Sequence, residues 1–300
     1  MIKEKAKTYE ITITKTFAPT KMQKKLINFL NKLIMSTKLK KNYDFSFKTQ
    51  TYTLKFILTH IVCFLHEYKC WRNLGKVWNN IYKHYIKLNK CGIMMNSNKL
   101  LLEKYLKRKN KKTLKFVSCD VTILINKNGI DCKGRNKYAK NKNCTKLFTI
   151  IDKNKIPIVM FFISGNTNDI VCLNKSLEKF LIQYGKNIYY FLADTGFNSK
   201  YISELLQKYG VNYLIPKNMR NAKKYKNKNK KLSHNEKFKI QFEDFTEKDK
   251  KIYKKRIVVE NMYANYKNSN KRFNIREDKY IKNLEGLTYM YFSEKILEKI

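Results

Sequence analysis

Residues 115–125 read KFVSCDVTILI, a run of β-branched and apolar residues that is interrupted by one acid, Asp120. Such a run predicts a largely buried strand. Two further strands are expected at 146–151 and 156–163, and the four residues between them suit a hairpin turn. The first part of the sheet is therefore predicted to consist of three sequential strands.

The pattern after these strands changes to alternating helices and strands. Helical spacing covers 169–184 and 199–209, and Gly210 is a good C-cap for the second helix. Strand spacing covers 188–192 and 211–216. Three sequential strands followed by strand–helix–strand crossovers predict an α/β fold, with a mixed sheet and helices on both faces.

The first 110 residues are expected to be mainly helical. Helices are predicted near 54–65 and 79–88, on either side of the segment WRNLGKVW (71–78). This pair suits a helix-turn-helix that reads DNA, and it equally suits a small helical bundle. We therefore divide the chain into a helical N-terminal region, 1–110, with DNA binding as its expected role, and a catalytic domain, 111–300.

Two Lys-rich stretches interrupt the predicted order of helices and strands. The basic run 104–112 is predicted to link the two domains. The stretch 217–251 is polar and predicts an insertion that forms a mobile loop within the second domain. After it, residues 253–268 predict a last helix.

The charge of the chain is strongly unbalanced. There are 65 Lys and Arg against 23 Asp and Glu, which gives a formal net charge of +42. A polyanionic partner is the natural interpretation, and nucleic acid is the commonest one. An AT-rich genome would also inflate Lys without selection for binding. Arginine is therefore the more informative cation, and Arg256, Arg272 and Arg276 fall within one short stretch.

The seven cysteines are scattered and include no CxxC pair. Their distribution favours neither a zinc ribbon nor a disulfide framework, and it suits a reducing compartment. The N-terminus lacks the apolar core of a secretion signal, and the longest apolar runs are too short to span a bilayer. We expect a protein that is not secreted and that acts in the cytoplasm or at the nucleoid.

Two carboxylates stand out against the predicted sheet. Asp120 interrupts an apolar strand, where burying an unpaired carboxylate would be costly. A salt bridge or an outward-facing position would also explain it. Asp194 follows the strand 188–192 just before a glycine turn, at the edge where ligands bind in open α/β sheets. Each acid alone leaves both a structural and a functional role open.

A third carboxylate, Glu260, lies in the predicted last helix. One face of that helix carries Tyr253, Arg256, Glu260, Tyr263 and Lys267. Another face is apolar and is predicted to pack on the sheet: Val259, Met262 and Tyr266. An ordinary amphipathic helix with a solvated stripe would give the same pattern. The pattern also suits a functional role. An Arg one turn before the acid and a Lys beyond it could bind phosphate, while the acid itself binds a metal ion.

These spacings resemble the Y-(2)-R-(3)-E-(6)-K signature of bacterial insertion-sequence DDE transposases. The resemblance is to the type found in insertion-sequence families four and five. All four positions match: Tyr253, Arg256, Glu260 and Lys267. Other segments are similar to further motifs of the family, in chain order: SCDVT (118–122), KLFTIIDKNKIPI (146–158), SGNTND (164–169), LADTGFNS (192–199), YGVNYLIP (209–216) and RFNIREDK (272–279). The chain departs from the family at Thr195, where a basic residue is usual, and at Glu277, where an aromatic is usual.

The resemblance implies an RNase-H-like catalytic core with a metal site. Asp120, Asp194 and Glu260 would bind two divalent ions, magnesium or manganese in its place. Hard cations of this kind prefer carboxylate oxygens, and a metal pair neutralises the charge that develops during phosphodiester transfer. The resemblance also implies a set of DNA-contacting residues: Tyr253, Arg256, Lys267, Arg272 and Lys146.

The implied activity is metal-dependent DNA strand cleavage and strand transfer at the ends of a mobile element. Double-stranded DNA would be the partner, as element end and as target, and the DNA complex would contain a homodimer. Two alternatives remain open at this point. One is an RNase-H-like nuclease without joining activity, and the other is a non-catalytic, DNA-binding relic of a transposase.

Overall fold

The computed structural model describes residues 19–36, 52–66, 71–110, 112–218, 234–269 and 273–300. The chain forms two compact units. Unit 1 takes residues up to Arg108 together with Asn128–Asp131 and Tyr266–Ile300, and unit 2 takes Lys109–Lys127 and Cys132–Asn265. Unit 1 is mainly helical, and unit 2 holds a mixed sheet flanked by helices. The α/β class and the helical N-terminal region predicted from the sequence are confirmed.

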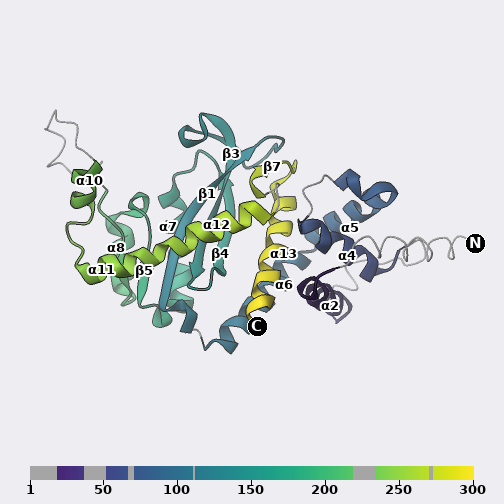
Figure 1. The fold of residues 1–300 in the computed structure, drawn as a ribbon, viewed down its shortest axis with the longest axis horizontal. Helices are drawn as coiled ribbons and strands as arrows, with labels where there is room; N and C mark the ends of the chain where they lie inside the picture. The colour runs from purple at the N-terminus through teal and green to yellow at the C-terminus, as the bar shows by residue number, and fades with distance from the viewer. Residues whose placement is uncertain (1–18, 37–51, 67–70, 111, 219–233, 270–272) are drawn as a thin grey trace, which may run out of the picture. The chain divides into compact units, whose positions relative to one another are not determined.

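The sheet of unit 2 is built around the long strand β1 (Phe116–Asn126). On one side β1 pairs with β3 (Lys142–Asp152), and β3 pairs with β4 (Pro157–Ser164), all antiparallel. On the other side lie β5 (Tyr190–Leu192) and β6 (Asn212–Leu214), which run parallel to β1. The order β4–β3–β1–β5–β6 is the mixed, RNase-H-like arrangement expected from the sequence (Figure 1).

Local sequence explains the connections of the antiparallel part. The Asp152 carboxylate accepts hydrogen bonds from the backbone N–H groups of Asn154 (2.9 Å) and Ile156 (3.0 Å), which holds the turn between β3 and β4. Between β1 and β3 the chain forms a further short strand, β2 (Gly134–Asn136), which pairs with the start of β3. The sequence did not predict β2, because three residues are too few to show a strand period.

The crossover helices lie where the sequence predicts them. α7 (Asp169–Tyr184) begins after Asn168, and α8 (Lys200–Lys208) begins after Ser199. Each of these two side chains accepts a hydrogen bond from a backbone N–H in the first turn of its helix, which satisfies a donor that the helix cannot. Gly210 follows α8 with φ 67°, the left-handed conformation that ends a helix.

The prediction of a loop across 217–251 is wrong for its second half. The described part contains two helices, α10 (His234–Gln241) and α11 (Glu247–Tyr253). The side chains of Thr246 and Asp249 form a capping box at the start of α11, with an N–H to Oγ1 distance of 3.1 Å. Polar composition masked these helices, because neither has the apolar stripe on which a sequence prediction relies.

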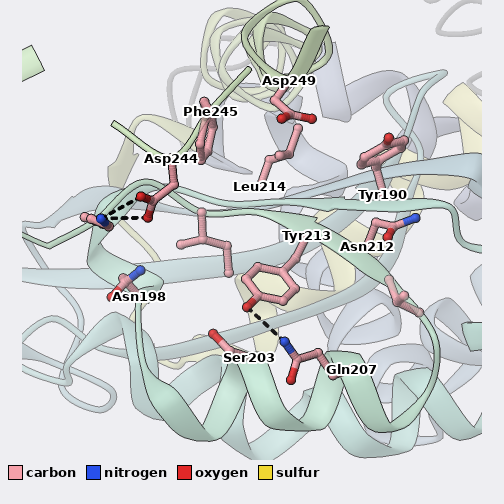
Figure 2. A pocket seen from close by; sticks show the side chains of 13 residues that line it. Tyr190, Asn198, Ser203, Gln207, Asn212, Tyr213, Leu214, Asp244, Phe245 and Asp249 are labelled. Carbon is pink, nitrogen blue, oxygen red and sulfur yellow. Dashed lines mark hydrogen bonds and ion pairs between the residues drawn. The ribbon is translucent and has the colours of Figure 1, made fainter. Parts of the chain in front are cut away.

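Ion pairs also hold this segment against the sheet edge. Lys217 lies 2.7 Å from the carboxylate of Asp244 and 3.6 Å from that of Glu243. Asp244 borders a hollow of about 640 Å³ beside β6, whose lining also includes Tyr213 and Gln207 (Figure 2). None of the three predicted catalytic acids lines this hollow.

The predicted last helix is not a single regular helix. α11 leads into a 3-10 turn at Lys254–Arg256, which is followed by α12 (Ile257–Ser269). A 3-10 turn has fewer residues per turn than an α-helix, so the regular spacing used to place the polar face does not hold across it. Three apolar-face residues are buried as predicted: Val259, Met262 and Tyr266. Tyr263, assigned to the polar face, is buried too.

Unit 1 is assembled from helices that are distant in sequence. They are α2 (Lys21–Ser36), α4 (Leu54–Cys63), α5 (Trp78–Lys90), α6 (Ile93–Arg108) and α13 (Ile281–Lys299), with a short strand β7 (Ile275–Arg276). The segment Trp71–Val77 is a 3-10 helix that bends at Gly75, where φ is 67°. The helices predicted near 54–65 and 79–88 are thus confirmed. The basic run that begins at 104 is not all linker, because α6 continues through Arg108.

Within the described residues, no helix is both long enough and apolar enough to cross a membrane.

Candidate active site

Asp120 and Asp194 lie at the same level on neighbouring strands of unit 2. β1 and β5 are parallel, and Ser118 pairs with Leu192. Asp120 is two residues beyond Ser118, and Asp194 is two residues beyond Leu192, where β5 has ended and the chain turns. The Asp194 carboxylate accepts a hydrogen bond of 2.7 Å from the N–H of Thr195 and caps that turn. The parallel register therefore brings the two predicted acids side by side.

Arg256 connects Asp120 to Glu260. Its guanidinium donates a hydrogen bond of 3.2 Å to Oδ2 of Asp120 and also contacts Oε1 of Glu260, one helical turn further along. Asp120 and Arg256 are both partly buried, whereas the Glu260 side chain is 52% exposed. The three sequence-predicted acids are thus gathered around one cation in the same region of unit 2.

The environment of Asp120 changes its protonation. Burial raises the pKa of this carboxyl to about 6 from a reference of 3.8, and the nearby charge of Asp194 adds to the rise. The Val121 N–H, which donates a hydrogen bond of 2.7 Å to Oδ1, and the Arg256 charge oppose it. The pKa of Asp120 therefore lies nearer to neutral pH than that of a free carboxyl group, and added positive charge nearby would favour its ionised form.

Tyr263 ties the helix of Glu260 to the strand of Asp120. Its hydroxyl donates a hydrogen bond of 2.7 Å to the backbone carbonyl of Asp120, and it shares a bond of 2.8 Å with the hydroxyl of Thr149. Thr149 is the residue of β3 that pairs with Asp120. Sequence reasoning missed this connection. The available signal was Thr149 itself, a hydroxyl between the apolar residues Phe148 and Ile150.

Tyr253 makes a similar connection to the other acid. Its hydroxyl donates a hydrogen bond of 3.3 Å to the carbonyl of Ala193, the residue before Asp194. Burial is the main cause that raises the pKa of this phenol, which therefore stays protonated and remains a donor. The ring lies 5.9 Å from the guanidinium of Arg256. Tyr253 and Tyr263 thus fasten the end of α11 and the middle of α12 to the two acid-bearing strands.

The other predicted DNA-contacting residues lie in different settings. Lys146 is buried, and its ammonium lies 2.7 Å from Asp169 and 2.8 Å from the carbonyl of Thr167. Lys267 lies in the last part of α12, within unit 1, and burial lowers the pKa of its amine. Arg272 lies outside the described residues. The structure therefore brings Arg256 and Tyr253 to the acids, and it engages Lys146 in an internal ion pair.

Arg276, the last residue of the predicted arginine cluster, is fully buried in unit 1. Its guanidinium pairs with the carboxylate of Asp131, which also accepts a hydrogen bond of 2.9 Å from the N–H of Ile281. This arginine therefore stabilises unit 1, and it is not exposed for contact with a polyanion.

The donor set around Asp120 fits divalent metal ions in its chemistry. Asp120, Asp194 and Glu260 offer the carboxylate oxygens that magnesium and manganese prefer. Burial above all, and then the charge of Asp194, disfavours the ionised form of Asp120, and a bound cation would favour that form. Among the described residues, no group of three or more His, Cys, Asp and Glu side chains is arranged to hold a metal ion. The guanidinium of Arg256 contacts two of the three acids instead.

Comparison with known proteins gives one match. The family model of the transposase DDE domain matches residues 119–289, which is more than half of the chain and includes all three acids. No curated protein and no solved structure matches the chain significantly. The matched region begins inside β1 and takes in the whole of the described sheet that follows it. The chain belongs to the transposase DDE domain family.

Proposed function

We propose that the protein is a metal-dependent transposase that cuts DNA strands at the ends of a mobile element and joins the freed 3′-hydroxyl to target DNA. Asp120, Asp194 and Glu260 are the proposed catalytic residues and metal ligands. The observation that carries the proposal is their arrangement: Asp120 on β1 and Asp194 just after the parallel strand β5 are at one level, and Glu260 is linked to Asp120 through Arg256.

The metal would be magnesium, with manganese as a substitute, and two ions are proposed. Bound there, they would neutralise charge at the phosphorus and activate the attacking water or hydroxyl. The two aspartates would hold the metal from the sheet, and Glu260 would hold it from α12. The high pKa of Asp120 supports a site built to be completed by a cation, because its ionised form is otherwise poorly stabilised.

The other residues predicted from the resemblance would act on DNA. Arg256 offers a planar, permanently charged group suited to two oxygens of one phosphate. Tyr253, Lys267 and Arg272 are proposed as further contacts with the DNA backbone. Because an element has two ends that must be joined together, we propose that the DNA complex contains two copies of the chain, and that it forms wherever the element's DNA resides.

The decisive experiment is a cleavage and joining assay with magnesium and labelled duplexes taken from the DNA that flanks the coding sequence. We expect wild-type protein to nick the end and to give joined products. Asp194→Asn should abolish both activities, whereas Glu178→Gln, which removes an exposed acid on α7, should leave them intact. Equal activity of wild type and Asp194→Asn would refute the proposed site. Cleavage without joining would assign the chain to the nuclease alternative.

The pairing of Arg256 with both Asp120 and Glu260 supports one rival function, a DNA-binding relic in which the arginine has become a permanent internal counter-ion. Titration calorimetry with manganese separates the two. A catalytic protein should bind manganese in the micromolar to millimolar range and should lose this binding in Asp194→Asn. A relic should show no binding in either protein while still binding duplex DNA.

A further inference from the structure

The two longest strands of unit 2 continue well past the catalytic acids. β5 ends at Leu192, which is level with Ser118, whereas β1 runs on to Asn126 with β3 beside it. Since β5 is parallel to β1, Asp194 lies toward the same end of the sheet into which this ribbon of β1, β3 and β4 extends. The link between β1 and β3 therefore lies beyond the acids, at the edge of the sheet where the proposed chemistry occurs.

The end of this ribbon is strongly basic. We call residues 133–143, KGRNKYAKNKN, the basic arm. It contains five cations and no acid, and all five side chains are exposed: Lys133, Arg135, Lys137, Lys140 and Lys142. One of the five is an arginine, the cation that is scarce in this Lys-rich chain. Because these positive charges are concentrated on one element, they produce a local electric field that attracts a polyanion.

An aromatic ring lies at the tip of the basic arm. The Tyr138 side chain is 81% exposed, the highest value among the large hydrophobic residues that the structure describes, while its neighbour Ala139 is buried. Exposing a ring to this extent forgoes the free energy gained by burial, and it leaves most of the ring surface accessible to a partner. A ring between cations is the combination that nucleic-acid-binding surfaces use to contact phosphates and bases together.

The turn that presents Tyr138 is held in place by its own hydrogen bonds. The side chain of the buried Asn136 accepts a bond of 2.9 Å from the N–H of Tyr138 and donates one of 2.7 Å to the carbonyl of Gly165. Lys140 and Asn141 both adopt left-handed conformations, with φ of 53° and 58°. The ring is therefore presented by a fixed turn, which lowers the entropic cost of binding a partner.

Close backbone packing fastens the arm to the turn after β4. A Cβ atom on Gly165 would lie 2.2 Å from the sulfur of Cys144 and 2.6 Å from the carbonyl of Gly134. The hydroxyl of Ser164 also donates a hydrogen bond of 2.6 Å to the carbonyl of Lys133. The arm is thus anchored along its length, and its cations occupy a defined position relative to the sheet.

We propose that the basic arm is a second DNA-contacting element, which grips duplex DNA at a fixed distance from the cleaved phosphodiester. Thr149, the partner of Asp120, is seven residues from Lys142 along β3, or roughly 23 Å at ~3.3 Å per residue. At ~3.4 Å per base pair, this is about seven base pairs of duplex. The lysines of the arm contact phosphates, and the Tyr138 ring packs against the sugar–base surface between them. This inference rests on DNA being the substrate, as in the proposed function.

The first test measures the salt dependence of binding. Affinity for a fluorescent 30-base-pair duplex is followed by anisotropy without divalent metal, for wild type and for Lys137→Gln/Lys140→Gln. Removing one lysine from a phosphate should reduce the slope of log affinity against log salt by about 0.9, so for two lysines we expect a reduction of about 1.8. The matched control is Lys175→Gln/Lys179→Gln, which removes two exposed cations from α7 and should leave the slope unchanged. Equal slopes for arm and control variants would overturn the inference.

The second test addresses the ring. Tyr138→Ala should weaken duplex binding about five-fold, as expected when roughly 40 Å² of apolar ring surface is no longer buried against the DNA, whereas Tyr138→Phe should bind like wild type. Because the side chain is exposed, both variants should keep the wild-type melting temperature. Identical affinities for Tyr138→Ala and wild type would remove the ring from the interface. Wild-type protein that binds no duplex at all would refute the proposed function as well, so the two failures are distinguishable.

Discussion

The guanidinium of Arg256 donates a 3.2 Å hydrogen bond to the carboxylate of Asp120, and the same group contacts Glu260. A single permanent cation therefore neutralises two of the three acids proposed to bind metal. A phosphate group and a carboxylate compete for the same face of a guanidinium. Arrival of DNA would thus draw Arg256 from the acids and leave their oxygens available to metal ions.

Removal of this cation should strengthen metal binding in the absence of DNA. We expect Arg256→Gln to bind manganese on the order of ten-fold more tightly than wild type by titration calorimetry, because a positive charge no longer opposes the incoming ion. Lys179→Gln removes an exposed charge on α7 and should bind manganese as wild type does. Weaker manganese binding by Arg256→Gln would mean that the arginine organises the acids and does not compete with the metal.

The raised pKa of Asp120 predicts a pH-dependent cost to stability. The folded pKa is about 6 and the reference value is 3.8, so the ionised carboxylate lowers the free energy of unfolding above pH 6, and the cost disappears as the pH falls toward 4. In EDTA at pH 8, Asp120→Asn should raise the free energy of unfolding by up to about 3 kcal/mol. At pH 4 the variant and wild type should unfold alike. A variant that is less stable than wild type at pH 8 would show that the ion pair with Arg256 outweighs burial.

The sheet could be predicted from the sequence because each long strand has a clear apolar period and a recognisable turn. The turn held by Asp152 and the cap at Asn168 are local signals, and both elements they bound appear where expected. The grouping of Asp120 with Asp194 was implied by the family resemblance, and the parallel register of β1 and β5 agrees with it. The strands, turns and caps depend only on neighbouring residues and on general rules of topology.

Features that depend on tertiary contacts could not be predicted in this way. Tyr263 was assigned to a polar helix face, yet its hydroxyl finds partners on β1 and β3, which allows burial. Lys146 was expected to contact DNA, and the structure pairs it with Asp169. The helix α11 was hidden because a capping box and ion pairs, rather than an apolar stripe, accompany it. A helical period identifies which residues share a face, but not which partners will meet them.

Loss of the Tyr263 hydroxyl should slow strand cleavage by more than the accompanying loss of stability explains. Tyr263→Phe leaves Thr149 and the Asp120 carbonyl without this partner, so we expect a loss of about 1–3 kcal/mol in the free energy of unfolding. Strand cleavage should also slow about ten-fold, because Glu260 is then less firmly placed relative to Asp120.

Tyr266→Phe is the matched control for that variant. Tyr266 is also buried on α12, and its hydroxyl shares a bond of 2.8 Å with Thr288 within unit 1. It should lose similar stability and retain the cleavage rate of wild type at a temperature where both variants are folded. Equal rates for the two variants would show that Tyr263 is only a structural residue.

The pair formed by Lys146 and Asp169 should act on stability and not on DNA affinity. The Lys146 side chain is only 8% exposed and its ammonium is 2.7 Å from Asp169, so a phosphate could reach it only if this pair opened. Lys146→Met should lower the free energy of unfolding by about 1–3 kcal/mol, less than for a fully buried pair because Asp169 is partly exposed. Adding Asp169→Asn should recover part of that loss, as expected for residues in direct contact.

Duplex binding by Lys146→Met should have the same slope of log affinity against log salt as binding by wild type. Lys137→Gln in the basic arm should reduce this slope by about 0.9. A reduced slope for Lys146→Met would instead place this lysine on a phosphate in the DNA complex.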